Sequence, residues 1–209
     1  MKRFSISCVI IITLSTVASF ILSYAQGRAG RWFSVFGFPA GIIPLLMNIS
    51  CLIVLCVLSL VALVKRQQAR LALAALSIST LLVVTEFIVS PARVFQFGFR
   101  QRIQGTLSAE ELRQIARVCH DTLPIDGMLP GPEKHSLWTE QEHRPIWVTL
   151  TNSSSLGKLD PSMVIFNRSD AVELSWGGAL VGHWGVRIQN EPVTNAGDIG
   201  PGITTFVSD

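Results

Sequence analysis

The side chains of this chain that could carry acid–base chemistry gather in one stretch, Ala171 to Gln189. It contains Glu173, His183 and Arg187 among apolar residues and glycines. If residues 177–179 form a three-residue hairpin loop, Glu173 lies directly opposite His183 on two paired strands. A carboxylate beside an imidazole can tune the ring for acid–base work. Glu173, His183 and Arg187 are therefore the candidate catalytic residues.

The same stretch also fits an ordinary hairpin with one solvated face. Period-two alternation puts His183 and Trp184 on opposite faces whatever the register. The predicted core face carries Val172, Leu174, Trp176, Trp184, Val186 and Ile188. Polar pairs are routine on a solvated face, which here also includes Ser175, so we favour a structural role for it. A two-residue turn at residues 177–178 would break the pairing of Glu173 with His183.

Cysteines and the remaining histidines form no recognisable site. The four cysteines are Cys8, Cys51, Cys56 and Cys119, and no two are spaced as a CxxC pair. Cys119 falls on the apolar side of a predicted helix, with His120 on another face, so we expect a buried and inert thiol. A proline-rich stretch contains Glu133, His135, Glu140, Glu142 and His143 in spacings that fit no zinc signature. We expect neither a metal nor another cofactor.

Common catalytic motifs do not occur in the sequence. There is no Walker loop, dinucleotide fingerprint or Gly-x-Ser-x-Gly elbow, so whether the chain is an enzyme stays open. Gly182 and Gly185 flank His183-Trp184 and indicate a close backbone approach or a bulge.

Three apolar runs predict the elements that hold these residues in place. Residues 42–64 carry no charge, and residues 71–89 carry one, Glu86. At a rise of about 1.5 Å per residue, the first of these runs makes roughly 35 Å of helix, enough to cross a hydrocarbon core of about 30 Å. Residues 4–24 follow Lys2-Arg3 and predict a further span. Small residues before Gln26 leave a cleaved signal peptide as the alternative for that run, but its length favours a span.

The short link between the second and third runs predicts the orientation. Residues 65–70 include three basic side chains, and such links stay in the cytoplasm. We therefore expect a cytoplasmic amino terminus, a membrane anchor over residues 1–90 and an extracytoplasmic domain over residues 91–209. The anchor has seven basic residues and one acid, whereas the domain has ten and thirteen. Because the basic excess belongs to the anchor, we expect no nucleic-acid partner.

Polar residues inside the apolar runs predict how the spans pack. Ser15, Ser19 and Ser23 recur every four residues and form a stripe that lets helices approach closely in lipid. Ala75 and Ser79 offer a similar notch, and Asn48 a hydrogen-bonding group. The arginines and aromatic residues of the loop at residues 27–41 suit the level of the lipid head groups.

Glu86 is the single acid of the predicted anchor. An ionisable residue inside a membrane is by default a functional candidate. Since Glu86 lies close to the end of its run, we expect it to reach water or to pair with Arg28, Arg31 or Arg93. We favour this structural role over a proton relay.

The rest of the chain predicts one small α+β domain. In residues 106–123, Ser108 and Glu111 form a capping box ahead of an apolar stripe, which indicates an amphipathic helix. Residues 93–104 fit either a strand or a helix, and residues 124–145 predict a polar connector. Strands are predicted at residues 146–151, 163–167, 171–176, 180–189 and 203–207. The expected fold is one helix packed on an antiparallel sheet.

These features favour an integral membrane protein with an exported interaction or sensing domain. Its expected partners are membrane lipid and a protein in the membrane or envelope. One alternative is a membrane-tethered enzyme, possibly a hydrolase, that uses His183 with Glu173. Another is an accessory subunit of a membrane complex, which the serine stripe suggests.

Overall fold

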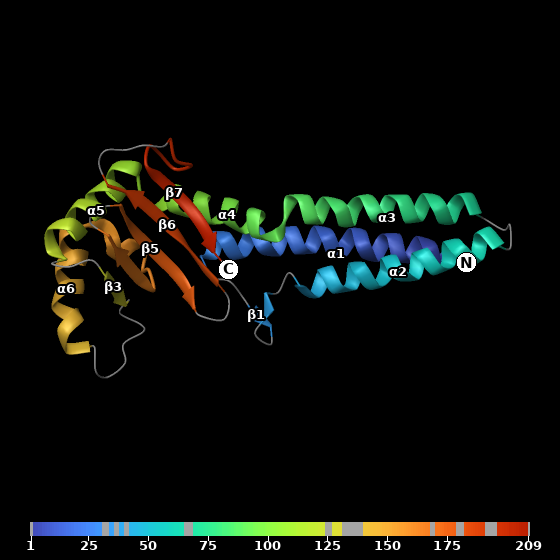
Figure 1. The fold of residues 1–209 in the computed structure, drawn as a ribbon, viewed down its shortest axis with the longest axis horizontal. Helices are drawn as coiled ribbons and strands as arrows, with labels where there is room; N and C mark the ends of the chain where they lie inside the picture. Colours follow the sequence, from blue (N-terminus) through green and yellow to red (C-terminus); the bar gives the residue numbers. More distant parts are fainter. Residues whose placement is uncertain are drawn as a thin grey trace. The chain divides into compact units, whose positions relative to one another are not determined.

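A computed structural model describes residues 2–30, 34–35, 38–39, 42–64, 69–123, 127–130, 140–167, 170–178, 182–190 and 196–208 (Figure 1). The chain divides into two compact units. The helical unit comprises residues 1–26 and 33–95, and the α+β unit comprises residues 27–32 and 96–209. Each unit is described by itself.

Three long helices, α1 (Lys2–Ala29), α2 (Ile42–Val64) and α3 (Ala69–Val89), account for most of the helical unit. All three are long and apolar enough to cross a membrane, as the three apolar runs predict. Two short strands, β1 (Ser34–Val35) and β2 (Phe38–Pro39), pair between α1 and α2. Part of the predicted interfacial loop, including Arg31, Trp32 and Phe36, lies outside the described residues, as do residues 65–68 of the basic link.

The surface of the three helices is apolar, and their contact is lined by small and polar groups. Large apolar side chains remain exposed along all three helices, among them Leu14, Ile21, Leu60, Leu81 and Phe87. Ser19, Ser23 and Ser79 are buried instead, so the predicted stripe and notch face neighbouring helices. The Ser59 hydroxyl donates to the Ala72 carbonyl at 3.2 Å, which joins α2 to α3. Ile12, Leu55 and Val83 are buried as well, so an apolar exterior surrounds an interior of mixed apolar and small polar side chains, as expected of helices that pack in lipid.

Glu86 does not reach water, contrary to the prediction. Its side chain is 1% exposed and accepts a hydrogen bond from Asn48 Nδ2 at 2.7 Å. Within the described residues it forms no ion pair, and the Arg93 guanidinium donates to the Ile88 carbonyl at 3.3 Å instead. Glu86 lies on the side of α3 that faces α2. The prediction used only its distance from the end of the helix, which does not show on which side of the helix a residue lies.

A non-glycine residue with a positive φ separates α3 from the next helix, α4 (Pro91–Thr106). Ser90 has φ 53°, and its backbone N–H donates to the Glu86 carbonyl at 2.9 Å. The ambiguous segment at residues 93–104 is thus helical, with Phe95, Phe99 and Ile103 fully buried. Their spacing of four residues is the helical alternative that the sequence left open.

The α+β unit contains a five-stranded antiparallel sheet whose strands follow one another in chain order. The strands are β3 (Gly127–Pro130), β4 (Met163–Phe166), β5 (Ala171–Gly178), β6 (Gly182–Gln189) and β7 (Ile203–Ser208). Four of them confirm predicted strands. β3 was not predicted because it lies in the proline-rich segment, and Pro130 suits only an edge strand such as this one.

Helices α5 (Ala109–Thr122) and α6 (Glu140–Ser153) and the 3-10 helix η2 (Ser155–Lys158) complete the unit. The prediction of a strand at residues 146–151 is wrong, because these residues belong to α6. Their β-branched side chains favour a strand. Trp147 and Leu150, three residues apart, are both buried, and this helical spacing overrides the local preference.

The core of the unit lies on one face of the sheet. All six apolar side chains predicted for this face of the hairpin are buried: Val172, Leu174, Trp176, Trp184, Val186 and Ile188. The Phe99 ring of α4 meets the Trp176 ring edge to face, with centroids 5.2 Å apart. The Trp176 indole N–H donates to the Asp160 carbonyl at 2.9 Å. The face assignment made from alternation alone is therefore confirmed.

Gly185 confirms the predicted close approach on the opposite face. A Cβ at this position would lie 2.6 Å from Phe206 Cζ and closer still to the Leu174 carbonyl oxygen. The Phe206 ring on β7 occupies the space above the glycine, opposite it in the register. Only a residue without a side chain fits there.

We predict that Gly185→Ala destabilises the α+β unit by about 1–3 kcal/mol, because it overpacks this contact. Gly105→Ala is the matched control: its Cβ meets nothing within 4 Å, and α4 should be unchanged or stabilised by up to about 1 kcal/mol. Unfolding can be followed by thiol labelling of Cys119, which is 0% exposed, after alanine replacement of the other three cysteines. Equal labelling of the two variants would contradict the prediction.

Candidate functional site

The three candidate catalytic residues do lie on one face of the β5–β6 hairpin, but not in the predicted arrangement. Glu173 is opposite Arg187, and His183 is opposite Gly177. The predicted pairing of Glu173 with His183 is therefore wrong. The strands continue to Gly178 and Gly182, so residues 179–181, not 177–179, connect them. Gly177 stays in the strand at φ 106°, a conformation that glycine adopts without strain.

Arg187 is the centre of the polar group that does form. Its guanidinium lies 3.6 Å from Glu173 Oε1 and donates a short hydrogen bond to Asp170 Oδ2. The Arg187 side chain is 44% exposed, so solvent screens both ion pairs and each is worth at most about 1 kcal/mol. Asp170 is fixed by the turn before β5, where its N–H donates to the Asn167 carbonyl at 3.2 Å.

His183 and Ser175 are less exposed than a solvated face predicts. His183 is partly buried, and Ser175 is 1% exposed beside Gly185, its partner in the register. Together with the register, this removes the basis for a Glu173–His183 acid–base pair. The accessible part of the face is the charged end at Arg187.

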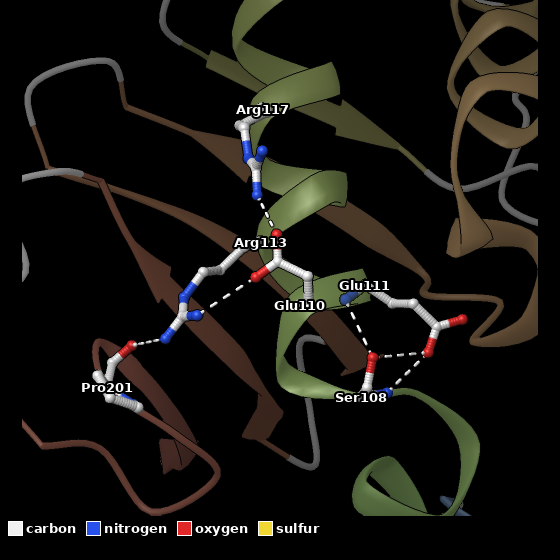
Figure 2. Close-up of polar contacts among 6 residues, drawn as sticks. All are labelled: Ser108, Glu110, Glu111, Arg113, Arg117 and Pro201. Atoms are coloured by element: carbon white, nitrogen blue, oxygen red, sulfur yellow. Dashed lines mark hydrogen bonds and ion pairs between the residues drawn. The ribbon is translucent and has the colours of Figure 1, made fainter.

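A second polar group fixes the amino-terminal end of α5 (Figure 2). As predicted, Ser108 and Glu111 form a capping box: the Ser108 N–H donates to Glu111 Oε2 at 2.8 Å, and the Glu111 N–H donates to the Ser108 hydroxyl at 3.2 Å. Lys158 Nζ and the Ser155 hydroxyl each lie 3.2 Å from Glu111 Oε1, so the carboxylate also joins α5 to η2. The bond from the Ser108 backbone, then those from its hydroxyl and from Lys158, lower the pKa of Glu111 from 4.5 to about 2.

In the same first turn of α5, Glu110 bonds two arginines on the helix surface (Figure 2). Arg113 lies 3.4 Å from Glu110 and donates to the Pro201 carbonyl at 3.3 Å, and Arg117 forms a short ion pair with the same carboxylate. The Arg113 bond ties the segment before β7 to α5. These contacts position elements.

Cys119 is buried, as expected. Burial raises the pKa of the Cys119 thiol to about 12, which keeps it inert near neutral pH. The exposed His120 lies on a different side of α5, where its ring packs against the Phe166 ring with centroids 6.1 Å apart. In the part of the chain that the structure describes, no three His, Cys, Asp or Glu side chains gather as metal ligands. Glu133, His135 and the side chains of Glu140, Glu142 and His143 lie outside that part.

Comparison with known proteins adds no further constraint on function. No protein-family model, curated protein or solved structure shows significant similarity to the chain. The site must therefore be judged on its own geometry. It offers one cation between two carboxylates on an accessible sheet face, which suits recognition of a charged or polar surface.

Sequence reasoning missed Asp170 as the second partner of Arg187 and missed Phe206 above Gly185. Both contacts follow once the register is known, since Asp170 immediately precedes β5 and Phe206 is opposite Gly185. The signal that would have found them is the continuation of both strands through the glycines at 178 and 182.

The low pKa of Glu111 predicts a pH-dependent contribution to stability. The folded pKa lies below the ordinary value, so the cap contributes fully above pH 4.5, and its contribution is lost as the pH falls toward about 2. The difference in melting temperature between the wild type and Glu111→Gln should therefore be largest above pH 4.5 and shrink below it. Circular dichroism of the whole chain in detergent measures this difference. Glu110→Gln is the control on the same helix turn, and an equal pH dependence in both variants would contradict the prediction.

Proposed function

We propose that this chain is an integral membrane protein that presents an extracytoplasmic binding domain. The observation that carries the proposal is the division of the chain into three membrane-length helices with an apolar exterior and a separate α+β unit that has its own core. The apolar exterior has a stable environment only in lipid or under another apolar surface. A domain with its own core can remain folded outside the membrane while the helices anchor it.

The orientation rests on the basic link at residues 65–70. Short loops that contain basic residues stay on the cytoplasmic side, so both outer ends of the α2–α3 hairpin face away from the cytoplasm. The α+β unit, which follows α3 in the chain, is then extracytoplasmic, and the amino terminus of α1 is cytoplasmic.

The binding surface that we propose is the charged end of the sheet face around Arg187, with Asp170 and Glu173. Their ion pairs hold the side chains in place, and all three remain partly exposed. A protein partner in the envelope with complementary polar groups suits such a surface, because electrostatic complementarity sets partner choice and register. The hydrolase alternative loses its geometric basis with the Glu173–His183 pairing. The serine stripe, which suggested a subunit of a complex, is used within this chain's own bundle.

Cysteine labelling tests the orientation. In a chain without native cysteines, Asn152→Cys should react with a membrane-impermeant maleimide in intact cells, and Gln68→Cys only after permeabilisation. Asn152 is exposed on α6, and Gln68 lies in the basic link. Labelling of both variants in denaturant controls for intrinsic reactivity. Reversed accessibility of the two positions would disprove the orientation.

Photo-crosslinking tests the binding surface. A photoreactive residue at Thr204, opposite Arg187 in the register, should give a discrete protein adduct in native membranes. The same residue at Asp121, 82% exposed on α5, should not. Arg187→Glu should reduce the Thr204 adduct at least about tenfold, which corresponds to the loss of about 1.4 kcal/mol of binding energy. Protection of Cys119 from labelling shows that this variant stays folded. Equal adducts from both positions, or none from Thr204, would contradict the proposal.

A further inference from the structure

We propose that Glu86 and Asn48 form a binding site for one monovalent metal cation inside the helical unit. The site would lie among α1, α2 and α3 and is separate from the surface around Arg187. The site depends on contacts within the bundle and not on the orientation of the chain in the membrane.

The side chains of the site are buried and joined to one another. Asn48 is 0% exposed, Glu86 1% and Thr16 4%, and each comes from a different helix. Asn48 Nδ2 donates to Glu86 Oε2 at 2.7 Å and to Thr16 Oγ1 at 3.0 Å. Both amide hydrogens of Asn48 are therefore used. The other polar atom of the amide is the acceptor oxygen Oδ1.

One oxygen acceptor of Glu86 and one of Asn48 remain. Glu86 Oε1 and Asn48 Oδ1 are both buried and, within the described residues, accept no hydrogen bond. A buried acceptor without a donor costs about 1–3 kcal/mol, and more for a charged group. Ser19 Oγ, one helical turn along α1 from Thr16, is a third buried oxygen in the same condition. The two acceptor oxygens of Asn48 and Glu86 are therefore in excess of the donors that the described residues offer them, and the Ser19 hydroxyl is a further buried oxygen on α1.

A hard cation satisfies this excess. Hard metal cations take oxygen ligands from carboxylates and amide carbonyls, and membrane transporters coordinate Na⁺ with backbone carbonyls inside a helix bundle. The charge of the ion follows from neutrality. Glu86 is the only acid on the three helices and has no ion-pair partner among the described residues. A monovalent ion cancels its charge, whereas a divalent ion would leave one net charge buried.

No other charged group on the packed helices competes for this role. α2 has no charged residue, and the other charged residues of α1 and α3 are basic and near their ends: Lys2, Arg3, Arg28 and Arg70. Arg70 precedes Glu86 by sixteen positions on α3, which at about 1.5 Å per residue is roughly 24 Å along the helix.

The test compares the stability of the full chain in different salts. The protein in detergent micelles is melted in sodium, potassium or choline chloride at one ionic strength and one pH, followed by circular dichroism. We expect the melting temperature to rise by several degrees, and to saturate, with sodium or potassium but not with choline, because a ligand of the folded state stabilises it. A melting temperature that is the same in all three salts would overturn the proposal. That result would indicate that the carboxyl is neutralised by a proton alone.

Variants locate the effect. Glu86→Gln keeps the size and an acceptor oxygen but removes the charge, and it should abolish the response to the alkali cation. Ser79→Ala, on the same helix and buried seven residues away, should retain the response, as should Glu111→Gln on the surface of the α+β unit. A response that persists in Glu86→Gln would overturn the site.

A direct measurement keeps the proposal testable if Glu86→Gln does not fold. Equilibrium binding of radiolabelled sodium and of radiolabelled rubidium, as a potassium substitute, to the wild-type chain in micelles should saturate at one ion per chain for at least one of the two. Ser19→Ala, which removes the third buried oxygen, should weaken that binding by about tenfold or more. Absence of saturable binding of both ions to the folded wild type would overturn the proposal.

Discussion

The hydrogen bonds of Asn48 to Thr16 and Glu86 are the interaction on which the helical unit depends. In lipid, where we propose that this unit lies, burial of apolar surface does not drive helices to associate, because the lipid tails are equally apolar. Association then rests on close packing of small residues and on hydrogen bonds between helices. Asn48 supplies both of its amide hydrogens to the other two helices, so one side chain of α2 connects all three. The buried serines let the helices approach closely around it.

The α+β unit is held by a different force, which is the burial of large apolar and aromatic groups on one sheet face. Trp176 and Trp184 face each other across the β5–β6 pair, and Phe99 from α4 packs on Trp176. Polar contacts at the edges of this core have positioning roles. Glu111 joins the start of α5 to η2, and Asp198 accepts from the Thr205 N–H on the edge strand β7, which satisfies a group that would otherwise be unpaired. The packed core therefore holds the strands in place, and the charged end of the opposite sheet face is exposed on this framework.

Charge is placed differently in the two units, and this difference separates the two proposals. Around Arg187 the ion pairs are exposed and screened, so they set geometry and contribute little stability. At Glu86 the carboxyl is buried: one oxygen accepts from Asn48 Nδ2, and the other has no donor among the described residues. The first arrangement suits contact with a partner surface, and the second suits a bound ion.

The sequence by itself determined the features that depend on neighbours within a few positions. The apolar runs, the Ser108–Glu111 cap and the two faces of the β5–β6 hairpin all follow from local spacing, because helical and strand periods fix which side chains share a side. Alternation kept the faces right even though the register was wrong, since the error was an even number of positions. Tertiary structure alone decided the rest. The register placed Glu173 with Arg187, burial of Trp147 and Leu150 made residues 146–151 helical, and packing of α3 against α2 turned Glu86 inward. Each of these depends on contacts between residues far apart in the chain, whose free energy no local pattern contains.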